Sequence, residues 1–231
     1  MKKNIFFVLI LLAACSTSTP VATPAPIRLE YTASTQPWLA GLYDCAGKTM
    51  ILAEQRVADN FSADADIALR LGEPVRLSTP AYQLGEEEIL IIAHPQNPVP
   101  NLKREQIIGL FTGQFRNWRE VGGSDLPVQV WVFSSGEDIQ QIFNRNALGD
   151  ASTSSLARLA VDPAQMQEAV AGDPAAVGIL SKRWLSEDVR ILELPNDLSE
   201  ALKVPVLAIA MPESREVLSS LLSCVEPAAQ P

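Results

Sequence analysis

Short apolar runs alternate with helical patterns along most of the chain, and this alternation constrains the fold more than any other feature. The runs expected as strands are 27–32, 49–53, 66–71, 88–93, 128–133, 177–180, 189–194 and 204–210, and the segments expected as helices are 36–44, 102–111, 137–147, 163–171 and 214–224. Alternating strands and helices predict an α/β fold with largely parallel sheets. Periodicity alone leaves open one domain or two small lobes.

The N-terminus indicates export from the cytoplasm. Lys2 and Lys3 precede an apolar run over residues 5–14. Because a membrane-spanning helix needs about 20 apolar residues, this run is too short to span a bilayer and is typical of a signal peptide. We therefore expect residues 1–14 to be a signal peptide.

Small residues lead into Cys15, and the segment 12–15 resembles the lipobox of bacterial lipoproteins. The resemblance implies that Cys15 is acylated and anchors the chain to a membrane on the extracytoplasmic side of the cell envelope; the alternative is an ordinary secretory signal. Residues 16–26 contain only Ser, Thr, Pro, Val and Ala. Such a segment buries little apolar surface, so we expect 15–26 to be a tether.

The charge of the chain argues against nucleic acid as a partner. Without residues 1–14, 16 basic and 27 acidic residues remain, and the formal charge is −11. A nucleic-acid surface is usually basic. The charge does not restrict a small ligand, since a cleft has its own local field.

If Cys15 carries lipid, Cys45 and Cys224 remain. In an oxidising compartment they predict a disulfide, and two buried free thiols are the alternative. The single histidine, His94, has no neighbouring ligands at metal-site spacing, so we expect no metal site and no cofactor. No nucleophile pattern, P-loop or dinucleotide motif is visible, and we expect no enzyme activity.

The middle of the chain contains several distinctive segments: 97–102, 105–107, 110–113 (Leu-Phe-Thr-Gly), 117–123 (Asn-Trp-Arg-Glu-Val-Gly-Gly) and 173–179 (Asp-Pro-Ala-Ala-Val-Gly-Ile). In these segments the chain resembles the phosphate-type substrate-binding proteins of ABC transporters. The resemblance implies a type II periplasmic-binding-protein-like α/β fold, with two lobes joined by two crossover hinges. One lobe would comprise 27–93 plus 190–225 and the other 94–189. This mapping places both Cys45 and Cys224 in one lobe.

In that family, backbone N–H groups and hydroxyls at helix N-termini hold an anion. Transferred to this chain, the predicted cleft residues are Ser34 and Thr35 at the first helix, and Ser134, Ser135 and Gly136 before the helix at 137. Ser134 and Glu137 also form a capping-box pattern. Their ligand would be a small molecule or ion.

The sequence departs from the family at the anion site. Where the family has an arginine stands Phe133, and where it has Gly-Ser-Gly-Thr stand Gly136, Glu137, Asp138 and Ile139. Two carboxylates near a bound phosphate would each cost on the order of a few kcal/mol at an effective dielectric near 20. Arg70 could supply a compensating charge.

Two functions follow from these observations. The first is an extracytoplasmic, lipid-anchored solute-binding protein, with phosphate or another small oxyanion as ligand and a membrane permease as partner. The alternative is a ligand-free interaction module with the same fold, which the altered anion motif favours.

Overall fold

The computed structural model describes residues 25–47, 50–58, 61–74, 79–149, 151–210, 219, 221 and 224 of the chain. The strands are β1 (Ile27–Tyr31), β2 (Leu52–Arg56), β3 (Ile67–Leu71), β4 (Ala81–Ala93), β5 (Gln129–Val132), β6 (Arg158–Leu159), β7 (Ala176–Ser181), β8 (Arg190–Leu192) and β9 (Lys203–Ala210). The helices are η1 (Ala33–Trp38), α1 (Leu39–Ala46), α2 (Arg104–Thr112), η2 (Trp118–Val121), α3 (Asp138–Phe143), η3 (Asn144–Leu148), α4 (Pro163–Gly172), η4 (Lys182–Trp184) and α5 (Asn196–Ala201).

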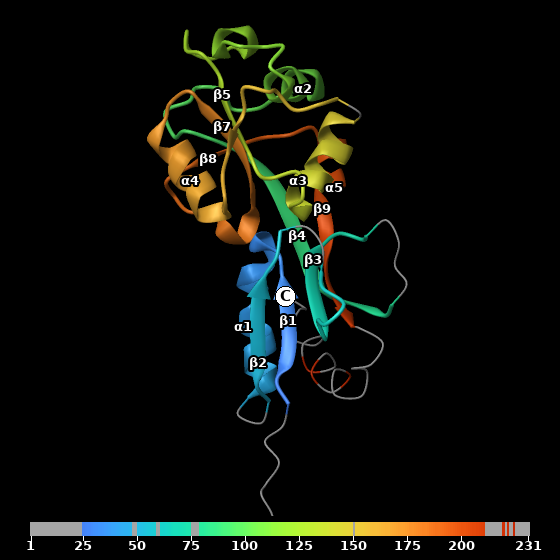
Figure 1. Ribbon diagram of the computed structural model, residues 1–231. Coiled ribbons are helices and arrows are strands. Elements are labelled where there is room, and N and C mark those ends of the chain that lie inside the picture. Colours follow the sequence, from blue (N-terminus) through green and yellow to red (C-terminus); the bar gives the residue numbers. More distant parts are fainter. Residues whose placement is uncertain are drawn as a thin grey trace, which may run out of the picture.

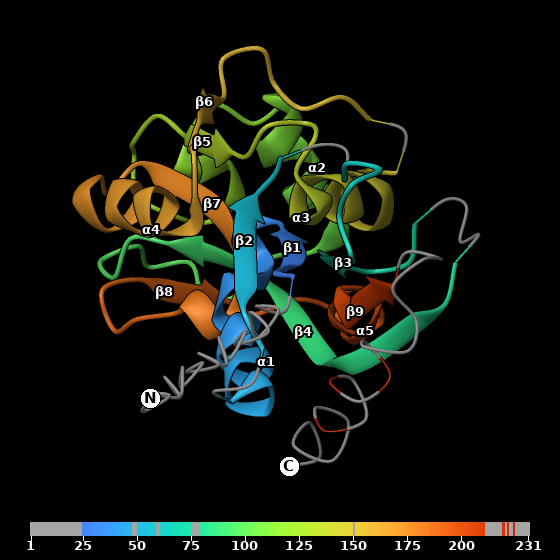
Figure 2. The ribbon, with the colours of Figure 1, turned by 60° about the horizontal axis from the view of Figure 1, so that its bottom comes forward.

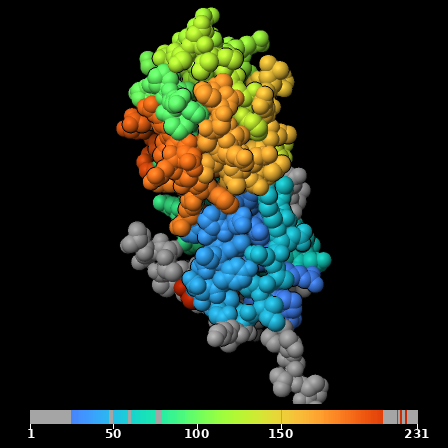
Figure 3. Space-filling model, turned by 90° about the vertical axis from the view of Figure 1, so that its left-hand side faces the viewer, coloured from blue at the N-terminus to red at the C-terminus, as the bar shows by residue number. Residues whose placement is uncertain are grey.

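These elements form two α/β lobes, as predicted (Figure 1). We name the part with β1, β2, β3, η1 and α1 the first lobe, and the part with β5 to β8 and α2 to α5 the second lobe. β4 and β9 connect them. On the face shown in Figure 3, the blue and cyan surface of the first lobe meets the orange surface of the second lobe directly. The division of the chain at residues 94 and 190 stays a prediction.

The sheet is mixed, so the expectation of largely parallel pairing is wrong. β1 pairs in parallel with β2 and β3, and β5 pairs in parallel with β6 and β7. β9 and β4 lie between these groups and pair antiparallel with each other, with β3 and with β7. The physical reason is that the connecting strands cross from one lobe to the other in opposite directions.

β4 is longer than its apolar run predicts. It pairs with β9 through Glu88, and from Ile89 to Ala93 it pairs with β7 and β8. The predicted strand begins only at Glu88, and the acidic residues Glu86 and Glu87 precede it. One of them, Glu87, is only 3% exposed. Charge in the sequence therefore did not prevent burial, since partners on other elements contact this carboxylate.

The motif that resembles the family is structural in the second lobe. α2 ends at Gly113, whose φ of 77° is the left-handed conformation that favours glycine. Trp118 is 1% exposed, and its indole N–H donates to the carbonyl of Ala175 at 2.9 Å. A Cβ at Gly123 would approach the side chain of Trp118 to 3.0 Å. These residues shape the lobe.

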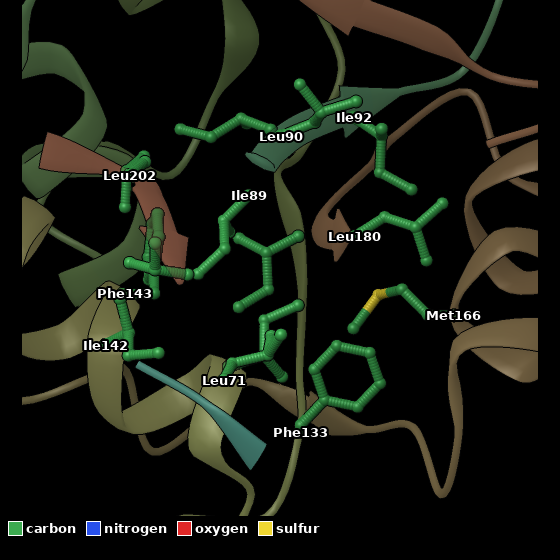
Figure 4. Close-up of a cluster of buried hydrophobic side chains, with 14 of the residues drawn as sticks. Leu71, Ile89, Leu90, Ile92, Phe133, Ile142, Phe143, Met166, Leu180 and Leu202 are labelled. Carbon is green, nitrogen blue, oxygen red and sulfur yellow. The ribbon is translucent and has the colours of Figure 1, made fainter. Parts of the chain in front are cut away.

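A continuous apolar core joins the two lobes. Leu71, at the end of β3, lies beside Ile142 of α3 and Phe133 in Figure 4. The next residue, Gly72, has φ of 66°, and a Cβ there would lie 3.1 Å from the side chain of Ile142. β3 and α3 therefore pack closely, and Figure 2 shows α3 beside β1 and β3 from a second direction.

The structure joins Cys45 and Cys224 by a disulfide, with a Cα–Cα distance of 5.8 Å. Cys15, the predicted signal peptide and most of the predicted helix at 214–224 lie outside the described residues. Among the helices of the described part of the chain, none is both long enough and apolar enough to cross a membrane.

Candidate functional site

The carboxylate of Asp138 lies at the junction of the lobes and bonds to the first lobe. Its Oδ2 accepts a hydrogen bond from the Thr32 hydroxyl at 2.8 Å and from the Leu71 backbone N–H at 2.7 Å. Its Oδ1 accepts from the N–H of Ile139 at 2.7 Å. The side chain is buried, with the whole residue 3% exposed. Three donors thus surround one carboxylate, as donors surround a bound oxyanion.

Burial raises the pKa of Asp138. The hydrogen bonds from Leu71, Thr32 and Ile139 oppose this rise, and so does the positive charge of Arg70. These groups favour the ionised carboxylate. They offset part, but not all, of the rise in pKa that burial causes.

The first turn of α3 differs from the predicted capping box. Glu137 is the N-cap residue and makes no side-chain cap, and α3 begins at Asp138. The Ser134 hydroxyl instead accepts from the N–H of Gly136 at 3.4 Å, within its own turn. The capping-box interpretation is wrong because both carboxylates turn toward the first lobe.

Glu137 makes a second contact between the lobes. Its Oε1 lies 3.5 Å from Nη2 of Arg56 on β2, and the same guanidinium donates to the carbonyl of Val161. Glu137 is 3% exposed. Burial, and after it the charge of neighbouring Asp138, raise its pKa to about 7, although Arg56 and the backbone of Ala33 oppose the rise. Sequence analysis did not identify Arg56, because nothing along the chain relates β2 to residue 137.

Arg70 supplies a positive charge near Asp138, whereas Phe133 supplies none. Arg70 on β3 is near enough to Asp138 to oppose the rise of its pKa, and burial lowers the pKa of Arg70 itself. Its Nε has no hydrogen-bond partner among the described residues. Phe133 is 2% exposed and packs in the core near Met166 (Figure 4). The cation of this region thus comes from β3, and position 133 supplies apolar contact.

The first predicted helix start is buried. Ser34 is 1% and Thr35 0% exposed. The Thr35 hydroxyl donates to the carbonyl of Thr32 at 3.0 Å and lies 3.2 Å from the Thr32 hydroxyl. Thr35 therefore orients Thr32, which bonds to Asp138. The hydroxyl of Ser34 has no partner among the described residues.

The second predicted helix start is at the surface. Ser134 and Ser135 are exposed and Gly136 is half-buried. The side chain of Gln141 donates to the carbonyls of Ser135 and Gly136 at 3.3 and 3.1 Å. The structure therefore brings the neighbourhood of Ser34 and Thr35 to Asp138, while Ser134 and Ser135 face outward. A role in ligand binding for all six predicted residues stays a prediction.

A further contact lies where β4 crosses between the lobes. The indole N–H of Trp38 on η1 donates to Oε2 of Glu87 at 3.2 Å. Arg183 of η4 stacks over the Trp38 ring at 3.8 Å from its centre, and its Nε lies 3.9 Å from the same Glu87 oxygen. A Cβ at Gly85 would come within 2.5 Å of the Trp38 ring. This cluster was missed because its residues are far apart in sequence.

Comparison with known proteins agrees with this architecture. The family model described as "PBP superfamily domain" matches residues 81–221, more than half of the chain. The chain belongs to the PBP superfamily. The match includes β4, α3 and β9, and thus the second-lobe side of the junction at Asp138.

Phosphate receptors are among the solved structures whose fold resembles that of this PBP superfamily member. A protein described as a phosphate ABC transporter substrate-binding protein with bound phosphate, from Clostridium perfringens, aligns with a TM-score of 0.78 at 18% identity, covering 87% of this chain and 93% of the other. An ABC-type phosphate transport receptor from Vibrio cholerae aligns with a TM-score of 0.70 at 20% identity, with the same coverage. The CcmR regulatory domain from Synechocystis in complex with 2-PG aligns with a TM-score of 0.62 at 11% identity, covering 89% and 97%. At these identities the likeness shows the fold.

Proposed function

We propose that this chain is an extracytoplasmic, lipid-anchored PBP-type domain that acts as an interaction module, with its cleft closed by its own carboxylates. The observation that carries the proposal is the bond of Asp138 to the Thr32 hydroxyl and the Leu71 N–H across the lobes. A free oxyanion would need these donors. We assign the domain no catalytic activity.

The contacts on both sides of the junction support this proposal. Glu137 meets Arg56 beside Asp138, and Trp38 meets Arg183 beside the crossing of β4. Closure of this kind usually needs a ligand to bridge two lobes. Here the side chains of the protein supply the bridges, so we expect a closed form without added solute.

An exposed apolar segment offers a surface for a partner. Leu156, Leu159 and Val161 are 73%, 63% and 65% exposed. They lie around β6, which forms an edge of the sheet. Neighbouring exposed apolar side chains commonly mark interaction sites. This supports a protein partner for the second lobe.

The solute-binding receptor is the second candidate, and one observation favours it. The donors around Asp138, together with the charge of Arg70, suit an oxyanion if the α3 turn moves away. The similar fold of the Clostridium perfringens protein, whose structure contains bound phosphate, adds to this argument. Such a receptor would deliver its ligand to a membrane permease.

Hydrogen exchange on the full-length chain, purified in detergent, separates the two candidates. The module predicts slow exchange at the Leu71 amide without solute and no change on adding millimolar phosphate, sulfate, molybdate or polyamine. A receptor would show slower exchange around residues 32–35 and 71 only when its ligand is present, and that result would overturn the module.

The lipid anchor has its own test. Cells that express the chain are grown with radiolabelled palmitate, and the label on the protein is measured. We expect labelling of the wild type and none of Cys15→Ser. Equal labelling of both proteins would contradict acylation at Cys15.

A further inference from the structure

The carboxylate of Asp138 meets hydrogen-bond donors of the first lobe in the way that a bound anion would. The Thr32 hydroxyl and the Leu71 N–H converge on one oxygen, Oδ2, at 2.8 and 2.7 Å. The two donors come from the ends of different strands, β1 and β3, which pair in parallel and therefore end at the same edge of the sheet. Their convergence is a property of the first lobe, while the acceptor comes from the second.

The supporting groups also suit an anion. The Thr35 hydroxyl donates to the Thr32 carbonyl at 3.0 Å and lies 3.2 Å from the Thr32 hydroxyl, which fixes the position of Thr32. Arg70, one residue before Leu71, brings a positive charge, and its Nε has no partner among the described residues. A built set of donors with an adjacent cation is the composition of an oxyanion site.

We propose that Asp138 is an internal ligand: its carboxylate fills an oxyanion site on the first lobe and excludes free oxyanions from it. This inference rests on the proposed function, because it explains how the cleft closes on itself. It makes Asp138 the residue that sets the specificity of the cleft. It also assigns a latent ligand class, tetrahedral oxyanions, to Thr32, Leu71 and Arg70.

The test removes the internal carboxylate and supplies an external one. Full-length wild type, Asp138→Gly and Asp138→Asn are titrated with phosphate, sulfate and molybdate by calorimetry at constant ionic strength. Asp138→Gly is expected to gain at least about 100-fold in oxyanion affinity over wild type, since two strong hydrogen bonds are each worth tenfold or more. Asp138→Asn keeps the volume and an acceptor oxygen, so we expect no gain from it.

The controls separate this site from general charge effects. Asp125→Asn removes an exposed carboxylate that pairs with Arg119 far from the junction, and it is expected to bind like wild type. If Asp138→Gly is unfolded, millimolar phosphate is expected to restore its folded circular dichroism spectrum. Asp138→Ser, which keeps a short polar side chain, is then titrated as the second variant.

The outcomes distinguish the two proposals. If wild type binds oxyanions as well as Asp138→Gly does, both the internal-ligand inference and the ligand-free module are overturned. If wild type, Asp138→Gly and Asp138→Ser all fail to bind oxyanions, and phosphate does not restore folding, the inference fails and the module stands. Strong binding by Asp138→Asn would also overturn the inference, because that side chain still fills the site.

Discussion

The turns that open η1 and α3 face the same junction, yet they are built in opposite ways. At the start of η1 the hydroxyls of Thr32 and Thr35 are buried and lie 3.2 Å apart, and the Thr35 hydroxyl donates to the Thr32 carbonyl. Before α3 the hydroxyls of Ser134 and Ser135 are exposed, and the carboxylates of Glu137 and Asp138 are buried instead. One turn supplies donors and the other supplies acceptors. The comparison teaches that two helix starts can close on each other when one of them carries its own anion.

The largest expected effect comes from breaking the central contact. Asp138→Ala leaves the Thr32 hydroxyl and the Leu71 N–H buried without their acceptor. We expect the free energy of unfolding to fall by about 3–5 kcal/mol, as for other broken buried charge contacts. Denaturant unfolding at neutral pH measures this. A loss no greater than that of the exposed-site control Asp125→Asn would contradict the assigned contact.

The second prediction concerns pH and Glu137. Its pKa is about 7 in the folded protein, against an ordinary value of 4.5. The unfolded chain therefore releases this proton first, and the raised pKa lowers the stability of the fold as pH rises from 4.5 to 7. Glu137→Gln lacks this ionisation, so we expect it to be more stable than wild type by about 3 kcal/mol at pH 8 and equal to it near pH 4.5, at about 1.4 kcal/mol per pKa unit.

Thermal and denaturant unfolding across this pH range give the measurement. Glu168→Gln is the matched control, because Glu168 is exposed on α4. The control is expected to follow the wild type at every pH. A constant difference between Glu137→Gln and wild type from pH 4.5 to 8 would show that burial does not raise the pKa of Glu137.

The third prediction tests the contact beside the β4 crossing. Trp38→Phe removes the indole N–H that donates to the buried carboxylate of Glu87. We expect a loss of about 1 kcal/mol, the usual net value of one hydrogen bond. Trp184→Phe is the matched control, since the Trp184 N–H has no acceptor among the described residues. If both variants lose the same free energy of unfolding, the Trp38–Glu87 hydrogen bond does not contribute to stability.

The smallest effects sharpen the contrast between the two turns. Ser135→Ala changes an exposed side chain, and we expect the free energy of unfolding to stay within about 0.5 kcal/mol of wild type. Ser34→Ala removes a buried hydroxyl that has no partner among the described residues, so we expect no loss and a gain of up to about 1 kcal/mol. Chemical denaturation measures both. A loss above 1 kcal/mol for Ser34→Ala would show that its hydroxyl has a partner.

Several features of the fold were predictable because they depend on neighbouring residues. The strand predicted over 88–93 follows from its local apolar run and is confirmed as part of β4. The first half of β4 was not predictable, because the acidic run 86–88 resembles a solvated turn. Glu87 is buried against Trp38 and Arg183, which are both far from it in sequence.

The candidate site divides in the same way. The absence of an arginine at Phe133 and the presence of carboxylates at Glu137 and Asp138 are plain in the sequence, and they predicted a changed anion site. Whether those carboxylates would face solvent, cap α3 or cross to the other lobe was open. Arg56 could not be linked to Glu137 at all, because β2 and α3 are about 80 residues apart and loop closure over such lengths leaves no local signal.

The sequence by itself determined the α/β class and the chemistry at the start of α3, because apolar periodicity and residue type act locally, and the resemblance of its motifs to a known family predicted the two lobes. Only the tertiary structure decided that Asp138 bonds to Thr32 and Leu71. The physical reason is that hydrogen-bond donors from two strand ends converge only after the sheet forms and the lobes pack together.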